Sequence, residues 1–250
     1  MRIKYLKNEK YPKAQEFNLF IERVFPQLLE EKKPELYLVA GGDGSMLHSI
    51  QANIDSKIPF FGKAYGTVNF LLNEFKNDQE TIQNILDDKI KLDIFETYAI
   101  SAYLDGKKLG EAVNDVILGD EIMSNHYFTL STKSGDFLNF EFRGSGLCIS
   151  TPIGSTAFNY NNNGRILPLD SDLLSITGVV CNKQINDIIH FEKVSIKSNG
   201  VRVYLTNVKS KILKEGSELI LKKGSKIRIA FLNKKDFLQK RIELGHRFRK

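Results

Sequence analysis

The chain has 250 residues, of which 42% are hydrophobic and 26% are charged, and its formal net charge is +6 at pH 7. This length and composition are typical of a globular protein with two domains, and no apolar run is long enough to span a membrane. Its basic residues are spread along the chain and form no stripe with interleaved aromatic rings, which argues against a nucleic-acid surface. The N-terminus lacks the apolar core of a signal peptide, so we expect a cytoplasmic protein that binds neither membrane nor nucleic acid.

The first part of the chain alternates between predicted strands and helices. Short apolar runs at 3–6, 36–40 and 58–61 predict buried strands. Apolar residues at helical spacing predict helices from Pro12 to Pro26, after Gly44, and from Asn77 or Asp78, either of which can cap the last helix. This alternation predicts an α/β domain with a parallel sheet over residues 1–92, whose ligands gather at the carboxyl ends of the strands.

The hydrophobic pattern changes after about Ile90, where period-two stretches replace helical ones. Predicted strands include 113–118, 127–131, 137–142, 194–196, 201–205, 219–221 and 227–231. We therefore predict a second, β-rich domain over residues 93–231. The tail 232–250 is too polar to form a core, and we expect it to pack back on the first domain through the apolar residues Phe237, Leu238, Ile242, Leu244 and Phe248.

The turn Gly41-Gly42-Asp43-Gly44 joins a predicted strand to a predicted helix. Its glycines permit positive φ, and free amides at the start of a helix attract phosphate. A carboxylate in such a turn repels phosphate unless a cation lies between them or it faces a hydroxyl that must lose a proton. Both situations belong to phosphoryl transfer, in which Asp43 would act as the base. The alternative is that Asp43 caps the helix, assisted by Ser45.

Two polar stretches of the second half also have chemical character. Asn114-Asp115 interrupts an apolar run, where it can bind ribose hydroxyls or an adenine edge, or form a bulge or turn. Residues 143–164 concentrate serine, threonine, glycine and asparagine, which we interpret as a loop that surrounds a polar ligand, with Phe158 or Tyr160 offering a ring face. Cys148 and Cys181 are isolated, so we expect neither a disulfide nor a metal site built by the chain.

Taken in order, GGDG, the segment 66–71 (GTVNFL), Asn114-Asp115 and the segment 150–158 (STPIGSTAF) resemble the motifs of the NAD kinases. GGDG alone is shared with phosphofructokinases and with diacylglycerol or sphingosine kinases, whereas the serine- and threonine-rich loop after an Asn-acidic pair is more specific. The resemblance implies an α/β domain followed by a β-rich dinucleotide-binding domain, a returning tail, and a homo-oligomer, either a dimer or a tetramer.

The resemblance also implies roles for particular residues. Asp43 would be the base or orienting carboxylate for the 2′-hydroxyl of the adenosine ribose of NAD. Gly41, Gly42 and Gly44 would face the phosphates of the donor, which is ATP or polyphosphate accompanied by Mg²⁺ or another divalent cation. The residues assigned to the dinucleotide are Phe70, Asn114, Asp115, Arg143, Ser145, Thr156, Ala157, Phe158, Asn161 and Val180, and in some members the positions of Arg143 and Ser145 approach the ligand from a neighbouring subunit.

Three positions depart from the family pattern. Asp115 stands where the family usually has glutamate, Ser145 where it often has aspartate, and Phe158 where it often has tyrosine. Two other functions remain open at this point. A non-catalytic sensor of NAD(H) or NADP(H) would keep the pocket and lose the carboxylate that Asp43 supplies. A lipid kinase would share GGDG but would need an apolar acceptor pocket, which the hydroxyl-rich loop argues against.

Overall fold

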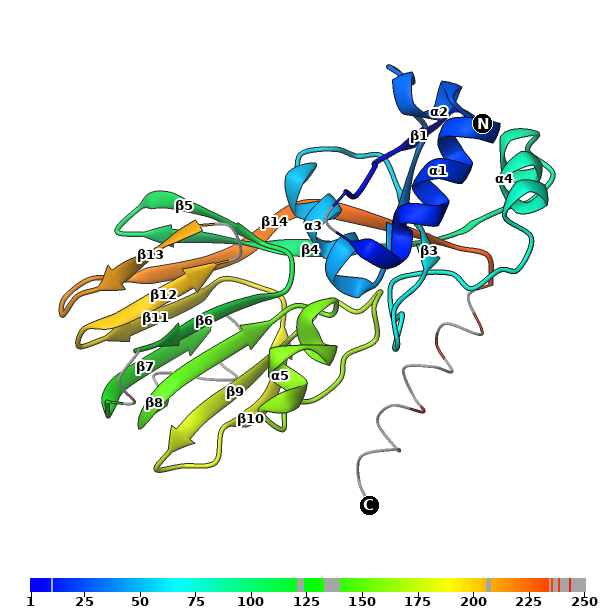
Figure 1. Ribbon diagram of the computed structural model, residues 1–250. Helices are drawn as coiled ribbons and strands as arrows, with labels where there is room; N and C mark the ends of the chain where they lie inside the picture. Colours follow the sequence, from blue (N-terminus) through cyan, green and yellow to red (C-terminus); the bar gives the residue numbers. More distant parts are fainter. Residues whose placement is uncertain are drawn as a thin grey trace. The chain divides into compact units, whose positions relative to one another are not determined.

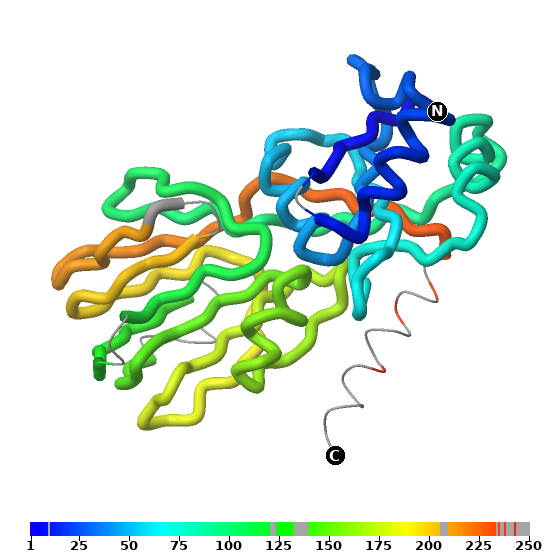
Figure 2. The backbone as a smooth tube through the Cα atoms, viewed as in Figure 1, coloured from blue at the N-terminus to red at the C-terminus, as the bar shows by residue number. Residues whose placement is uncertain are grey.

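The computed structural model describes residues 1–9, 11–120, 124–132, 140–205 and 208–233, together with residues 235, 238 and 243. The chain divides into two compact units, Met1–Glu96 with the segment that begins at Ile227, and Thr97–Lys226. The chain therefore changes unit within β4 (Asp93–Leu104) and again within β14 (Leu219–Phe231), whose course is seen in Figure 2. The expected packing of the tail 232–250 concerns residues that are mostly outside the described part of the chain.

The first unit is built on a parallel sheet (Figure 1). Its strands are β1 (Ile3–Tyr5), β2 (Leu36–Gly41) and β3 (Phe60–Ala64), and the end of β14 adds parallel to β3. Its helices are η1 (Pro12–Ala14), α1 (Gln15–Val24), α2 (Gln27–Glu30), α3 (Asp43–Ala52) and α4 (Asp78–Leu86). The predicted α/β alternation is confirmed, and Asn77 caps α4 by accepting a hydrogen bond from the amide of Glu80 at 3.1 Å.

Helices cover both faces of this sheet. Phe17 and Ile21 of α1 pack with Leu38 and Phe61 in one buried cluster, which α4 also joins. Neighbouring residues of a strand face opposite sides, so Gly62 faces away from this cluster. A Cβ at Gly62 would lie 2.6 Å from the terminal carbon of Met46, a residue of α3. The helix that begins at the GGDG turn is therefore packed closely against the second face.

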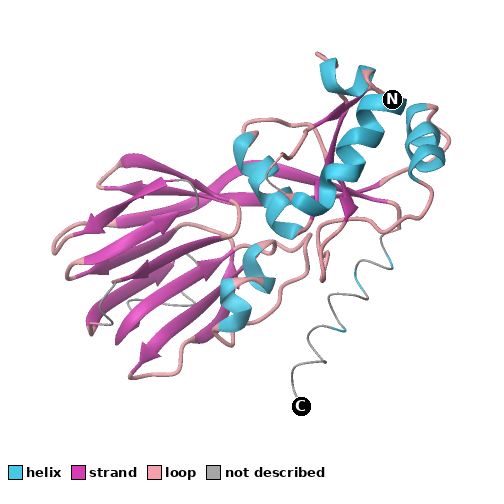
Figure 3. Cartoon of the chain, viewed as in Figure 1, coloured by secondary structure: helices cyan, strands magenta, loops and turns pink. Residues whose placement is uncertain are grey.

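The second unit consists almost entirely of antiparallel strands (Figure 3). Besides β4 and β14, the strands are β5 (Lys107–Ala112), β6 (Asp115–Gly119), β7 (His126–Thr132), β8 (Phe140–Ser150), β9 (Leu173–Cys181), β10 (Asn186–His190), β11 (Val194–Ser198), β12 (Val201–Leu205) and β13 (Val208–Leu213). Two short helical segments, η2 (Gly154–Thr156) and α5 (Phe158–Asn161), interrupt them. The predicted β-rich second half is confirmed.

One local prediction was wrong. Residues 143–164 do not form one loop, because 143–150 complete strand β8. The glycines and serines that suggested a loop lie in a strand with neighbours on both edges, since β8 pairs with β6, β7 and β9. Glycine and serine have a low intrinsic preference for strands, and the hydrogen bonds to strands on both edges outweigh that preference here.

Within the described residues, no helix is both long and apolar enough to cross a membrane.

The packing of β2 predicts a large effect of truncation. Leu38 is buried in the cluster beneath α1, so Leu38→Ala is expected to lower the free energy of unfolding by about 2–5 kcal/mol. The matched control is Leu19→Ala on the outer face of α1, where the side chain is 64% exposed, and its expected effect is within about 0.5 kcal/mol. Urea denaturation of the three proteins measures both values, and equal losses would contradict this description of the core.

Candidate active site

The turn after β2 needs glycine for a steric reason. Gly41 has φ +148°, and a Cβ there would lie 2.6 Å from the Cβ of Ser45. Gly42 is the N-cap residue of α3, and its carbonyl accepts the amides of Ser45 at 3.0 Å and Met46 at 3.2 Å. At Gly44 a Cβ would have no heavy atom within 4 Å, so the start of the helix is open there. The backbone is therefore closely packed at Gly41, whereas the space around Gly44 is empty.

A second glycine turn, after β3, lies against the first. The amide of Tyr65 donates to the carbonyl of Gly41 at 2.7 Å. A Cβ at Gly66 would come within 3.0 Å of the Cα of Gly42, so the two backbones approach more closely than any side chain would permit. Because β2 and β3 are parallel neighbours, both turns leave the same edge of the sheet.

Asp43 connects these two turns. It is the first residue of α3, and Gly42 occupies the cap position, so the interpretation of Asp43 as a helix cap was wrong. Its carboxylate instead accepts the amide of Phe70 at 3.0 Å and that of Leu71 at 2.8 Å, one on each oxygen. Each carboxylate oxygen can accept more than one hydrogen bond, so a half-buried Asp43 remains able to receive a hydroxyl proton. Phe70 itself, whose ring was predicted to line an adenine pocket, is buried.

In the second unit, Asp115 is held in a buried pair. It lies opposite Ser150 in the register of β6 and β8, and the Ser150 hydroxyl donates to its Oδ1. Burial raises the pKa of Asp115 to about 6, against the opposing effect of hydrogen bonds from Ser150 and Cys148. Burial, followed by the charge of Asp115, also raises the pKa of the Cys148 thiol. Ser150 and Cys148 are partners that sequence reasoning did not assign, because their register with Asp115 depends on strand pairing.

Asn114 precedes β6 and has an unsatisfied acceptor. Its side-chain Oδ1 is buried and has no hydrogen-bond partner among the described residues. Its carbonyl accepts the amide of Thr151 at 2.9 Å, and Gly154 packs so closely on it that a Cβ there would lie 2.6 Å from the Asn114 carbonyl carbon. A buried polar atom without a partner is uncommon in native proteins, and a bound ligand is one way to satisfy it.

Many polar residues of the 151–164 segment hold that segment together. Thr151 donates its hydroxyl to the carbonyl of Val113 at 2.7 Å, and Ser155 donates to the carbonyl of Pro152 at 2.8 Å. Asn159 bonds to Ser155, Arg165 and Ser175. These side chains therefore bond to groups within the segment and to its neighbours Val113, Arg165 and Ser175, while the idea that the segment surrounds a ligand stays a prediction. The predicted ligand residues Thr156, Ala157, Phe158 and Asn161 are partly or fully exposed, as are Tyr160 and residues 162–164.

Three other predicted residues meet where β8 pairs with β9. Gly144 lies opposite Cys181 and Gly146 opposite Val179, which places Ser145 opposite Val180. Val180 is 71% exposed and has φ +47°, which is rare for a β-branched residue. The guanidinium of Arg143 lies 4.3 Å from the ring centre of Tyr127 and donates to its hydroxyl at 2.6 Å. Tyr127 was not predicted, because the pairing of β7 with β8 places it there.

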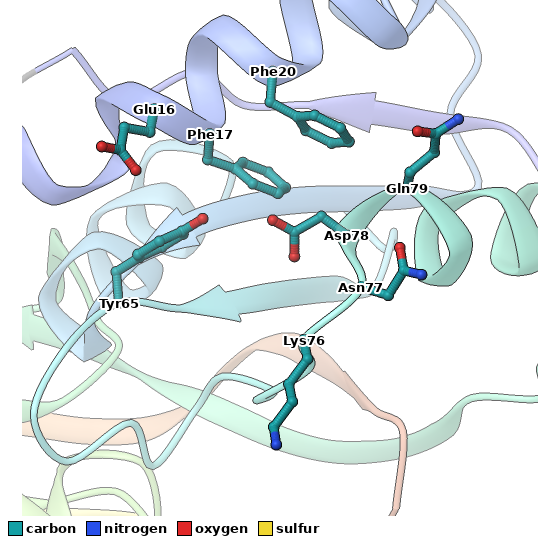
Figure 4. Close-up of a pocket in the computed structure, with 8 residues that line it drawn as sticks. All are labelled: Glu16, Phe17, Phe20, Tyr65, Lys76, Asn77, Asp78 and Gln79. Atoms are coloured by element: carbon teal, nitrogen blue, oxygen red, sulfur yellow. The ribbon is translucent and has the colours of Figure 1, made fainter.

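The first unit also contains a cavity that includes none of the predicted site residues. It has a volume of about 570 Å³ and lies between α1 and the start of α4 (Figure 4). Phe17 and Phe20 face Tyr65 and Asp78 across it. Burial is the main cause that raises the pKa of Tyr65 to about 12, and Asp78 forms an ion pair with Lys63 at 2.7 Å. The lining contains acidic Glu16 and Asp78 together with basic Lys76, so the cavity shows no preference for a ligand charge.

Comparisons with known proteins identify what the chain resembles. No family model matches it. It is 30% identical to an NAD kinase of Zymomonas mobilis over 176 residues, covering 67% of this chain and 65% of that protein. It is 30% identical to an NAD kinase of Rickettsia rickettsii over 149 residues, covering 59% of this chain and 57% of that protein. The matches thus span less than two thirds of these relatives.

The fold is similar to that of two solved structures. The yeast NADH kinase in complex with NADH superposes with a TM-score of 0.77 at 17% identity, covering 99% of this chain and 88% of that chain. An NAD kinase from Archaeoglobus fulgidus in complex with ATP superposes with a TM-score of 0.70 at 15% identity, covering 96% and 97%. The chain therefore has the same fold as these two structures. The resemblance to the NAD kinases that the motifs predicted is confirmed by the sequence relatives.

The raised pKa of Asp115 predicts a pH-dependent stability. Its value of about 6 exceeds the ordinary value of 3.8, so between these pH values the folded state binds more protons than the unfolded state. The free energy of unfolding from this group therefore falls as pH rises through that window, by about 3 kcal/mol in all. Asp115→Asn removes this loss, so the stability of the variant relative to wild type should increase from pH 4 to pH 7.

Urea denaturation of both proteins at several pH values measures this difference, in which the titration of other groups cancels. Parallel stability curves for the two proteins would contradict the burial of an ionisable Asp115.

Proposed function

We propose that the protein is an NAD kinase, which transfers a phosphoryl group from ATP or polyphosphate to the 2′-hydroxyl of the adenosine ribose of NAD and produces NADP. The observation that carries this proposal is the half-buried carboxylate of Asp43, fixed by two amides beside a glycine turn at the open start of α3. The sequence similarity to NAD kinases supports the same activity.

In this mechanism Asp43 orients the ribose hydroxyl and accepts its proton. The hydroxyl oxygen forms a bond to the terminal phosphorus of the donor, while the bond from that phosphorus to its bridging oxygen breaks. Proton loss comes late in a loose transition state, so an ionised aspartate serves as base although it is a weak one. The amides of Phe70 and Leu71 fix the direction of the carboxylate, which reduces the motion that must be frozen for reaction.

The glycine turn suits the phosphates of the donor. The start of a helix presents free amides and a partial positive charge, and Gly44 adds no side chain there. Gly41 and Gly42 have no side chain, so phosphate oxygens can approach the backbone of the turn closely. The three glycines are therefore proposed as donor-binding residues.

A divalent cation such as Mg²⁺ would neutralise the phosphate oxygens of the donor. Within the described residues, no group of three or more His, Cys, Asp or Glu side chains is arranged to hold a metal ion. Mg²⁺ commonly retains several waters and is bound by one or two carboxylates together with substrate phosphates. The donor phosphates would hold the cation, and Asp43, the carboxylate of the glycine turn, would assist them.

We assign the dinucleotide to the residues that the resemblance to the NAD kinases names. The unpaired Oδ1 of Asn114 suits a ligand N–H or O–H donor, and exposed Phe158 offers a face for stacking. The further binding residues proposed are Phe70, Asp115, Arg143, Ser145, Thr156, Ala157, Asn161 and Val180. By resemblance we also propose that the protein is a cytoplasmic homo-oligomer.

Substitution of Asp43 tests the proposal directly. NADP formation is measured for wild type with NAD, Mg²⁺ and either ATP or polyphosphate, and NAD binding is measured by calorimetry. Asp43→Asn keeps the size of the side chain but removes the base, so the expected loss in kcat is about 100- to 10,000-fold with NAD binding retained. The control is Asp55→Asn, an exposed aspartate of the same unit, which should keep its rate.

The same assay separates this function from its alternatives. Wild type that binds NAD but makes no NADP with either donor is a sensor and contradicts the proposal. A variant Asp43→Asn with the wild-type rate would exclude Asp43 as the base.

Substitution of Phe158 tests the dinucleotide site. The ring is 40% exposed and is available for stacking on a base. Phe158→Ala removes the ring face, and the expected rise in KM for NAD is about tenfold or more, from a stacking contribution of about 1–3 kcal/mol. Phe158→Tyr retains the face and should keep KM near the wild-type value. An unchanged KM in Phe158→Ala would remove Phe158 from the site.

A further inference from the structure

The residue before the two amides that hold Asp43 has an unusual backbone. Asn69 has φ +60°, in the left-handed region that few residues other than glycine adopt. It is 7% exposed, and its side-chain amide donates to the carbonyl of Gly66 at 2.8 Å. Asparagine tolerates this conformation better than most residues, and the hydrogen bond to Gly66 closes the turn locally.

The backbone angles of Asn69 set the direction of the Phe70 amide and of the chain that continues to Leu71. Successive amides beside a left-handed residue converge into a concave anion site, and here the amides of Phe70 and Leu71 converge on the carboxylate of Asp43. An extended conformation at Asn69 would rotate the 69–70 peptide, and the Phe70 amide would then no longer have the direction in which it meets Asp43.

The surroundings of Asn69 leave little freedom for another arrangement. A Cβ at Gly66 would lie 2.7 Å from the Oδ1 of Asn69 and 3.0 Å from the Cα of Gly42, so both atoms pack on the same side of Gly66. The Asn69 side chain is therefore packed next to the turn that carries Asp43. Its Oδ1 is buried and has no hydrogen-bond partner among the described residues, which is uncommon for a buried polar atom.

We infer that Asn69 is a positioning residue of the phosphoryl transfer, because its left-handed backbone directs the amides of Phe70 and Leu71 onto the carboxylate of Asp43. The inference rests on the proposed function, since it assigns Asp43 the role of base. Asn69 does not touch the reacting atoms in this scheme. It acts on the rate through the direction of the Asp43 carboxylate.

Three variants of the full chain test this role. Asn69→Ala resists the left-handed conformation, Asn69→Gly adopts it freely without a side chain, and Asp88→Ala is a matched control. Asp88 also has a positive φ, +56°, but it lies at the end of α4 in the same unit. Because the Asp88 carboxylate also pairs with the amino terminus of Met1 at 3.0 Å, the control measures an alanine at a left-handed position together with the loss of this exposed ion pair.

The measurements are kcat and KM for NAD, the Kd for NAD by calorimetry, and the amide NMR signals of Phe70 and Leu71. Asn69→Ala is expected to lower kcat by about 10- to 100-fold with Kd for NAD changed less than about threefold, because misplacement of a catalytic group affects rate more than binding. Asn69→Gly should recover most of the lost rate, and Asp88→Ala should keep it. The two amide signals should move upfield in Asn69→Ala and stay near their wild-type positions in Asn69→Gly.

A wild-type kcat and wild-type amide signals in Asn69→Ala would overturn the inference. Equal impairment of the alanine and glycine variants would overturn it too, because the side chain and not the backbone would then matter. If Asn69→Ala does not fold, Asn69→Ser takes its place with the same expectations. If wild type makes no NADP, the proposed function fails, and the amide signals alone decide whether Asn69 positions these amides.

Discussion

The hydrogen bonds from the amides of Phe70 and Leu71 to Asp43 are the constraint on which the candidate active site depends. They join the turn after β2 to the turn after β3, and they settle the direction of the one carboxylate in the glycine turn. This arrangement requires parallel neighbouring strands that end at the same edge, close approach of Gly42 and Gly66, and a left-handed residue at Asn69. A change in any of these moves the carboxylate, so the fold and the chemistry of the first unit are directly linked.

The second unit contains buried polar groups that lower its stability. Asp115 is placed against Ser150 by the register of β6 and β8, and burial raises its pKa to about 6. The neighbouring Asn114 leaves its Oδ1 buried and, among the described residues, unpaired. A buried polar group without a partner reduces stability, and the proposed dinucleotide would supply a partner for the Oδ1 of Asn114.

The segment 151–164 shows how one composition serves two purposes. Thr151, Ser155 and Asn159 use their side chains to bond backbone groups of the segment and of neighbouring residues, whereas Phe158 and Asn161 remain exposed. The sequence does not distinguish the two groups, because residue type alone does not show whether a polar side chain bonds to the backbone or faces solvent. Hydrogen-bond partners separate them, and these are known only once the segment is packed on β6 and β9.

The amino-acid sequence by itself determined the order of α/β and β-rich parts, the strand and helix on either side of GGDG, and the motifs that resemble those of NAD kinases. These features depend on local periodicity and on glycine and polar residues close in sequence. Tertiary structure alone decided that 143–150 forms a strand, that Asp43 is bound by amides and does not cap its helix, and that Tyr127 holds Arg143. Asp43 and Leu71 are separated by 28 positions, and strand pairing brings them together. A contact of that kind depends on which strands are neighbours, and no short stretch of sequence contains this information.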